Sequence, residues 1–208
     1  MTVNANTVNI KSDEAYHHGD LRAAAIALGL EKLASQEVPD LGLRAIAREL
    51  GVSATALYRH FAGKEALLEA LAAEGIRQLG ASQKAAAQRA GGGTAAFQAT
   101  GVAYVEWAVA NPALFALTFA GKTRPNLAMS DADGDENEAF RQLQAGISSV
   151  LPAMAPSADR ASAAMHAWSL VHGLANLILA GQIDDDPQVI RSVVAHTFGL
   201  GGGAADCA

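Results

Sequence analysis

The segment from Leu43 to Phe61, LRAIARELGVSATALYRHF, constrains the fold of this chain more than any other. Ile46 and Leu50 are four residues apart, and so are Leu57 and Phe61, so each half of the segment carries an apolar stripe on one helical face. The pattern predicts two short helices whose apolar stripes face one another.

A tight turn, Gly51-Val52-Ser53, is expected between these two helices. Gly51 favours the left-handed conformation that ends a helix, and the Ser53 hydroxyl is suited to accept a hydrogen bond from a free amide at the start of the next helix. The arrangement predicts a helix-turn-helix motif. The second helix of such a motif is sized to enter the major groove of DNA.

The charge of the same region points in the same direction. Residues 44–64 contain Arg44, Arg48, Arg59 and Lys64 against the single anion Glu49, so four minus one leaves +3 in a chain whose formal net charge is −6. A basic helix pair on an acidic protein is expected where phosphates bind. The alternative is a solvated helical hairpin with ordinary surface charges, but the turn chemistry and the aromatic end of the motif favour DNA binding.

An ordered motif surrounds the second helix: Leu57-Tyr58-Arg59-His60-Phe61, then Lys64-Glu65 and Leu67-Leu68, preceded upstream by Tyr16-His17-His18-Gly19-Asp20-Leu21-Arg22. Over roughly residues 16–70 this pattern closely resembles the DNA-binding domain of the TetR (tetracycline-repressor-like) family of bacterial transcription regulators. The resemblance implies a homodimeric, all-helical repressor whose larger C-terminal domain binds a small-molecule effector.

The resemblance also implies a set of DNA contacts on this head. Arg44, which opens the first helix of the motif, is expected near a base or a phosphate, and Tyr58, His60 and Lys64 are expected on phosphates. Small side chains at positions 54–56 predict contacts to thymine methyl groups, so that DNA shape carries part of the specificity. The predicted DNA-binding residues are Arg44, Ser53, Ala54, Thr55, Ala56, Tyr58, Arg59, His60 and Lys64.

The remaining sequence predicts helices and therefore an all-α fold. Asp20 is a good N-cap for a first helix, whose Leu21, Ala25 and Leu28 supply a third wall for the helix-turn-helix core. A later helix is expected to be capped by Ser157 or Asp159. Besides the two short helices, the expected ranges are 20–35, 64–89, 94–110, 112–120, 136–151, 160–179 and 187–198, with an acidic loop at 122–137.

These elements predict two domains flanked by flexible ends. Residues 1–15 form a flexible arm, residues 16–63 a helix-turn-helix DNA-binding domain, residues 64–200 a helical effector-binding and dimerisation domain, and residues 201–208 a flexible tail. The long helix that begins at Lys64 is expected to link the effector site to the head. Its Gly75 and Gly80 either soften this helix or allow close packing.

Composition excludes several classes of protein. No uninterrupted apolar run reaches the ~20 residues of a membrane span, and the N-terminus lacks the pattern of a signal peptide. The single cysteine, Cys207, permits neither a disulfide framework nor a thiolate zinc cluster. His17 and His18 are adjacent and cannot face one way along a helix as a metal pair. We therefore expect a cytoplasmic protein that needs no membrane, cofactor or metal.

Aromatic residues of the second domain suggest where an effector binds. Tyr104 and Trp107 share a helical face, and WSLVHG at 168–173 places Trp168 four residues before His172 and resembles a Trp…His-Gly signature of some TetR-type C-terminal domains. Both groups are either plain core or the wall of a ligand chamber. The candidate ligand-binding residues are Tyr104, Trp107, Phe115, Phe119, Trp168 and His172.

The last two helices predict a homodimer. Ala164, Trp168, Val171, Ala175 and Ile178 form one apolar stripe, expected to pack against a second copy in a four-helix interface. Since no catalytic constellation stands out, we expect no enzyme but a regulator of double-stranded operator DNA, released when an effector alters the spacing of its heads. The alternative is a small-molecule-binding or assembly dimer without operator recognition.

Overall fold

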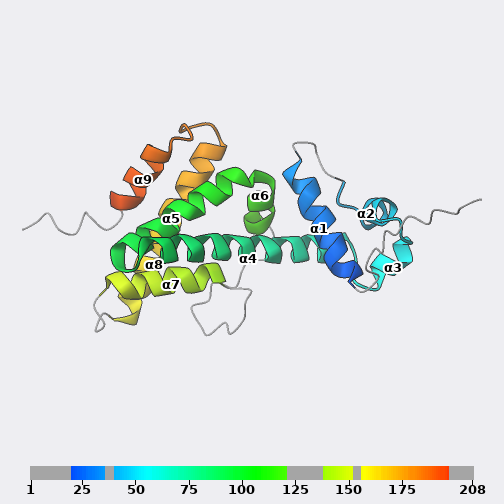
Figure 1. Ribbon diagram of the computed structural model, residues 1–208, viewed down its shortest axis with the longest axis horizontal. Helices are drawn as coiled ribbons and strands as arrows, with labels where there is room; N and C mark the ends of the chain where they lie inside the picture. The colour runs from blue at the N-terminus through cyan, green and yellow to red at the C-terminus, as the bar shows by residue number, and fades with distance from the viewer. Residues whose placement is uncertain (1–19, 36–39, 121–137, 152–155, 197–208) are drawn as a thin grey trace, which may run out of the picture.

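The computed structural model describes residues 20–35, 40–120, 138–151 and 156–196, and every regular element in these ranges is a helix (Figure 1). The predicted all-α fold is confirmed for this part of the chain. The elements are α1 Leu21–Ala34, α2 Leu43–Glu49, α3 Ala54–Tyr58, α4 Lys64–Ala90, α5 Gly93–Ala110, α6 Pro112–Ala120, α7 Glu138–Val150, α8 Ser157–Leu179 and α9 Pro187–His196.

Helix α4 is the axis of the molecule. It runs along the long dimension, with α1–α3 gathered at its first turns and α5 and α7 packed along its second half (Figure 1). Glu65 lies in its first turn and Arg89 in its last, where each charge complements the helix dipole. One continuous helix of 27 residues therefore belongs to both ends of the protein.

The head, formed by α1–α3 and the first turns of α4, has its own apolar core. Ile46, Leu57 and Phe61 are almost completely buried and pack against Leu67 and Leu71 of α4. These are the apolar stripes that the sequence predicts, now closed by a third wall. That wall comes from α1, where Ala25 is fully buried and Leu21 and Leu28 are partly buried against the same cluster.

The start of α1 agrees with its predicted cap. The Asp20 carboxylate accepts a hydrogen bond from the backbone N–H of Ala23 at 2.9 Å, which satisfies one of the free amides of the first turn. Further along α1, Lys32 forms a 2.7 Å ion pair with Glu49 of α2. The cap and the ion pair orient α1 across the helix-turn-helix motif.

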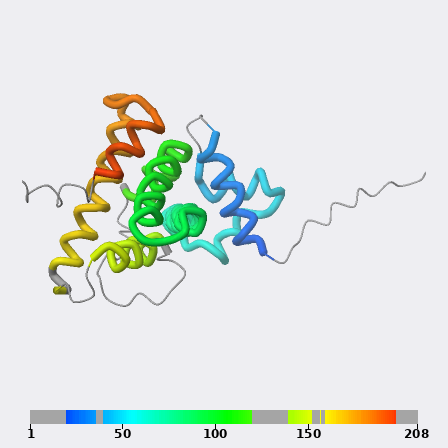
Figure 2. Tube along the Cα trace, turned by 60° about the vertical axis from the view of Figure 1, so that its left-hand side comes forward, coloured from blue at the N-terminus to red at the C-terminus, as the bar shows by residue number. Residues whose placement is uncertain are grey.

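The second apolar cluster joins α4, α5, α6, α8 and α9. Tyr104, Val105, Phe115, Ala175 and Ile190 are among its buried members. Figure 2 shows α8 beside α5 on the side away from the head. Side chains from five helices therefore share one apolar core in this half.

Gly75 decides how closely α6 approaches α4. A Cβ added at Gly75 would collide with the Thr118 hydroxyl and press on Leu114, both from α6. Of the two roles that the sequence left open for this glycine, the structure shows close packing.

Asn111 and Pro112 separate α5 from α6 as expected, and the two helices are bent by 108° relative to one another.

Some helix ends differ from the predicted ones. Helix α8 is preceded by Pro156 as its N-cap and has no side-chain cap bond, so the prediction that Ser157 or Asp159 caps it is wrong. Proline has no side-chain acceptor to offer, and the backbone N–H of Asp159 donates instead to the Pro156 carbonyl at 3.1 Å. The predicted arm at 1–15, acidic loop at 122–137 and tail at 201–208 lie outside the described residues.

Across the described ranges no single helix combines the length and the apolar composition needed to cross a membrane. Only α5 and α6 taken together pass such a test of length and composition, and they are sharply bent at their junction.

Candidate functional site

The turn between α2 and α3 has the geometry that its sequence predicts. Gly51 adopts a left-handed conformation with φ of 68°, and its N–H donates to the Arg48 carbonyl at 3.2 Å. Ser53 is the N-cap of α3, and its Oγ accepts from the backbone N–H of Ala56 at 3.2 Å. Because both helix ends are closed by local hydrogen bonds, the angle between α2 and α3 is set within a few residues.

Most of the predicted DNA-binding residues lie on the outside of this motif. Thr55, Tyr58, Arg59 and His60 are exposed, and nearly half of the Tyr58 surface is free in spite of its aromatic ring. Ala54 differs from the outward placement expected for it, because it is half-buried against the head core. Position 54 starts α3 close to the buried stripe, so only part of its methyl group faces outward.

Four cations make this face basic. Arg44, Arg48, Arg59 and Lys64 are all exposed, and none of them forms an ion pair within the ranges that the structure describes. The anion of this stretch, Glu49, is held by Lys32 of α1. The ion pair cancels the charge of Glu49, so the face is more positive than a count of residues 44–64 suggests.

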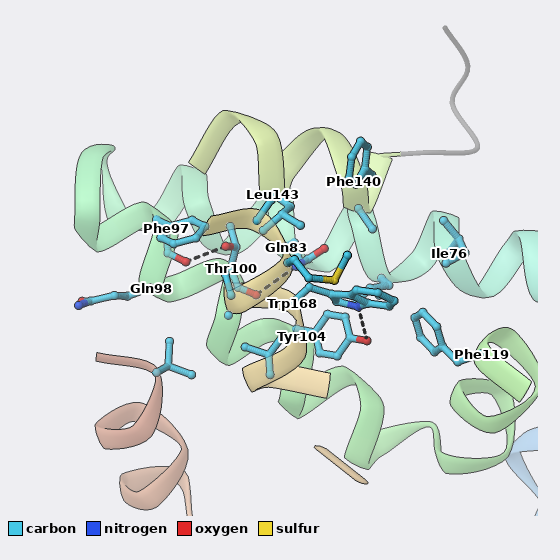
Figure 3. A pocket seen from close by; sticks show the side chains of 18 of the residues that line it. Ile76, Gln83, Phe97, Gln98, Thr100, Tyr104, Phe119, Phe140, Leu143 and Trp168 are labelled. Carbon is cyan, nitrogen blue, oxygen red and sulfur yellow. Dashed lines mark hydrogen bonds between the residues drawn. The ribbon is translucent and has the colours of Figure 1, made fainter. Parts of the chain in front are cut away.

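A cavity of about 100 Å³ lies in the other half of the molecule, between α4, α5, α7 and α8 (Figure 3). Its wall is mainly apolar, and no charged side chain from the described residues lines it. Three of the predicted ligand-binding residues, Tyr104, Phe119 and Trp168, belong to the wall. Aromatic and aliphatic side chains provide most of it, among them Ile76, Phe97, Phe140 and Leu143.

The other three predicted residues lie behind the wall. Trp107 and Phe115 are buried in the core shared by α4, α5 and α8, and neither lines the cavity. His172 packs its ring 5.0 Å from Phe119 and 5.6 Å from Trp168, measured between ring centroids. The predicted neighbourhood of Trp168 and His172 is thus present, with the indole at the cavity and the imidazole one layer behind it.

A short hydrogen-bond chain joins these rings. The Trp168 indole N–H donates to the Tyr104 hydroxyl oxygen at 3.4 Å, and that hydroxyl lies 2.8 Å from Nδ1 of His172. The direction of the Tyr104–His172 bond follows the tautomer of the imidazole: the hydroxyl donates to an unprotonated Nδ1 and accepts from a protonated one. Burial lowers the pKa of His172 and raises the pKa of Tyr104, so both groups stay uncharged at neutral pH.

Two families match the chain in succession. Bacterial regulatory proteins of the tetR family match residues 26–71, and the tetracyclin repressor-like C-terminal domain matches residues 97–197. A solved structure of a protein of unknown function from Rhodococcus sp. RHA1 is 32% identical, with a TM-score of 0.70, and the alignment covers 91% of this chain and 98% of that one. This chain belongs to the TetR family.

A further TetR-family structure shares the fold at low identity. The transcription regulator from Marinobacter aquaeolei VT8 is 17% identical, with a TM-score of 0.62, and the alignment covers 85% of this chain and 92% of that one. Among curated proteins no sequence matches the chain. Membership of the TetR family makes the protein a DNA-binding transcriptional regulator, whose helix-turn-helix is the α2–α3 motif described above.

In this TetR-family chain the apolar stripe of α8 has a role that differs from the predicted one. Ala164, Val171, Ala175 and Ile178 are buried within a single protomer, so the expectation that they pack against a second copy is wrong. Periodicity shows that a face is apolar but not what covers it, and here α5, α7 and α9 cover it. The large apolar side chains that stay exposed on α8 and α9 are Met165, Leu177, Leu179 and Val189.

Three features of the two sites escaped the sequence analysis. Gln83 of α4 and Thr100 of α5 are buried polar residues at the cavity. Arg22 places its guanidinium 5.7 Å from the centre of the Phe61 ring and so covers the end of the head core. One signal was available for Gln83, because it lies four residues after buried Leu79 and shares its helical face.

Proposed function

We propose that this TetR-family regulator is a homodimeric repressor whose two heads bind adjacent major grooves of an operator. The repressor dissociates from the operator when a small molecule binds in the cavity. The observation that carries the proposal is the course of α4. Lys64, at its first residue, belongs to the basic face, while Ile76, Leu79 and Gln83 of the same helix line the cavity. Nineteen residues separate Lys64 from Gln83, roughly 28 Å of helix.

On DNA, the head divides its contacts between positioning and recognition. Tyr58, His60 and Lys64 bind phosphates, and the small side chains at the start of α3 approach thymine methyl groups. Thr55 and Tyr58 are exposed, and the four cations around α3 have no ion-pair partner among the described residues; both observations support this assignment. The proposed DNA-binding residues are Arg44, Ser53, Ala54, Thr55, Ala56, Tyr58, Arg59, His60 and Lys64.

Dimerisation uses the outer faces of α8 and α9. Leu177 and Leu179 of α8 and Val189 of α9 are more than a third exposed in the isolated protomer, and none of the three lines the cavity. Their burial against a second copy would remove apolar surface from water on two helices that lie on the side of α5 away from the head (Figure 2). A two-fold axis there leaves both heads free to reach grooves about 34 to 36 Å apart.

Effector binding acts through the packing around α4. A ligand shifts the equilibrium only if it prefers one arrangement of the heads, so the cavity must change shape between the DNA-bound and the released state. Gly75 holds α4 tightly against α6, and α6 in turn contacts α1 of the head. A displacement of α4 or α6 by a ligand would therefore be transmitted to the head.

The test is the salt dependence of DNA binding. Fragments of the source genome are captured with the purified full-length protein, and affinity for a captured fragment is measured by fluorescence anisotropy over a series of salt concentrations. Lys64→Ala should weaken binding and reduce the log–log slope by roughly one, because one phosphate contact is lost. Lys84→Ala, the same change on the same helix but at the far end, should leave the slope unchanged.

Three outcomes would count against the proposal. Affinity that does not respond to salt in the unaltered protein would reject operator binding and favour a dimer that binds small molecules without recognising DNA. Operator affinity that ignores every ligand shown to occupy the cavity would reject release by an effector while leaving DNA binding intact. Sedimentation of the protein as a monomer would reject the two-headed arrangement.

A further inference from the structure

Gln83 is a buried polar side chain with half of its amide unused. It projects from α4, is only 6% exposed, and belongs to the wall of the cavity (Figure 3). Its Nε2 donates to the backbone carbonyl of Thr100 on α5 at 3.3 Å. Its Oε1 is buried and has no hydrogen-bond partner in the part of the chain that the structure describes.

The orientation of the amide follows from its neighbour. If the amide were turned over, Oε1 would face the Thr100 carbonyl oxygen, and two acceptors would oppose one another. The Thr100 hydroxyl does not help, because it donates to the Phe97 carbonyl at 2.7 Å. The unpaired group is therefore an acceptor, and the partner that it lacks is a hydrogen-bond donor.

Two other polar side chains of the cavity wall already have hydrogen-bond partners. The Tyr104 hydroxyl is held between Trp168 and His172, and the Gln98 amide donates to the Ala195 carbonyl. A buried acceptor without a partner costs about 1–3 kcal/mol, so a donor supplied by a ligand recovers free energy that an apolar ligand does not. Gln83 is thus the polar group of this wall that favours one ligand chemistry over another.

We propose that the effector is an uncharged molecule of about one aromatic ring that carries an N–H or O–H group, and that this group donates a hydrogen bond to Oε1 of Gln83. The inference rests on the proposed function and names the chemical class of its effector. The cavity of about 100 Å³ is smaller than an engineered apolar cavity of ~150 Å³ that binds benzene, so it limits the enclosed part of a ligand to about a single ring. The ligand is uncharged because burying an ion is costly in a wall that has no charged side chain among the described residues.

The ligand contact also lies on the helix that carries the proposed signal. Gln83 now ties α4 to α5 through the Thr100 carbonyl. A ligand that donates a hydrogen bond to the Gln83 amide acts on this contact between α4 and α5. A ligand held only by Phe140 and Leu143 of α7 would not act on it. Ligands with a donor should therefore affect α4 more strongly than apolar ligands of equal size.

The experiment compares three probes of similar size by calorimetry on the full-length protein without DNA. Phenol carries a donor, whereas toluene and anisole do not. In the unaltered protein phenol should bind saturably, and the ratio of toluene to phenol dissociation constants should fall about tenfold in Gln83→Met, where the stem is kept and the acceptor is lost. Gln98→Met, the same change at the same cavity, should leave the ratio unchanged, and anisole should follow toluene in all three proteins.

Two results would overturn the inference: an equal ratio in Gln83→Met and the unaltered protein, or no saturable binding of phenol. Gln83→Leu serves as a second variant if Gln83→Met does not fold. Because DNA is absent, the two proposals fail separately. A Gln83-dependent preference in a protein that ignores DNA would remove the repressor role and keep the ligand class. If a ligand releases the protein from DNA but its binding does not depend on Gln83, the repressor role stands and the proposed ligand class is rejected.

Discussion

The head and the cavity-bearing half of this protein bury different kinds of side chain. In the head, the buried residues of the described structure are apolar, and the charged and hydrogen-bonding groups lie outside on α2 and α3. The other half buries Gln83, Thr100 and Thr118 among its aromatic and aliphatic side chains. A surface built to meet phosphates needs only a rigid support, whereas a site that selects a small molecule needs polar groups in its interior.

The largest effect is expected from a change in the apolar core that supports the head. Phe61→Ala should lower the free energy of unfolding by about 3–5 kcal/mol, because the ring is almost completely buried between α1, α3 and α4. Denaturant unfolding measures this change, and operator affinity should fall with it. Thr55→Ala, an exposed change on α3, should leave stability nearly unchanged. Equal stability of the two variants would show that the head core is not the support described here.

A smaller effect is expected where α6 meets α4. Gly75→Ala should destabilise the protein by roughly 1–3 kcal/mol, because the added Cβ collides with the Thr118 hydroxyl. The paired change Gly75→Ala with Thr118→Ala removes the hydroxyl and should recover part of the loss in thermal unfolding. If Gly75→Ala alone were as stable as the unaltered protein, α6 would be able to move aside at little cost, and its contact with Gly75 would not couple it to α4.

The cap of α3 tests whether the head depends on local hydrogen bonds. Ser53→Ala should cost ~1 kcal/mol in stability, because the first turn of a five-residue helix loses the acceptor for the Ala56 amide. Ser53→Thr keeps the hydroxyl and should recover most of the loss in denaturant unfolding. No difference between the alanine and the threonine variants would assign the geometry of α3 to its buried face alone.

The smallest expected effect is a dependence of stability on pH that originates in the other half. Burial lowers the pKa of His172 in the folded protein below the usual value of 6.5. As the pH falls through 6.5, the histidine of the unfolded chain therefore takes up a proton before that of the folded protein does. Stability should therefore decline as the pH falls from neutral through this value. The midpoint of thermal unfolding should fall less steeply with pH in His172→Gln than in the unaltered protein. His166→Gln, an exposed histidine on the same helix, should retain the full decline.

Much of the head was predictable because its geometry is decided by residues close together in the chain. The apolar spacing of Ile46, Leu57 and Phe61, the left-handed Gly51 and the Ser53 cap act within one or two helical turns. Each therefore carries its structural meaning in its sequence neighbourhood. The ion pair between Lys32 and Glu49 was not predictable, since it joins α1 to α2 across the head.

The cavity was predicted only in part. Tyr104, Phe119 and Trp168 reach it, while Trp107, Phe115 and His172 lie in the layer behind, and aromatic spacing along a helix cannot separate these two positions. The apolar stripe of α8 shows the same limit, because its residues turn inward to their own protomer.

The sequence alone therefore determined the all-α class, the helix-turn-helix and the basic character of its face, since these depend on propensities, caps and charges that act locally. Only the tertiary structure decided what covers the apolar stripe of α8, that α6 rests on Gly75, and that Gln83 has an acceptor without a partner among the described residues, beside an apolar cavity. Each of these depends on the side chains that distant segments bring to the same place, and no periodicity within a single helix records them.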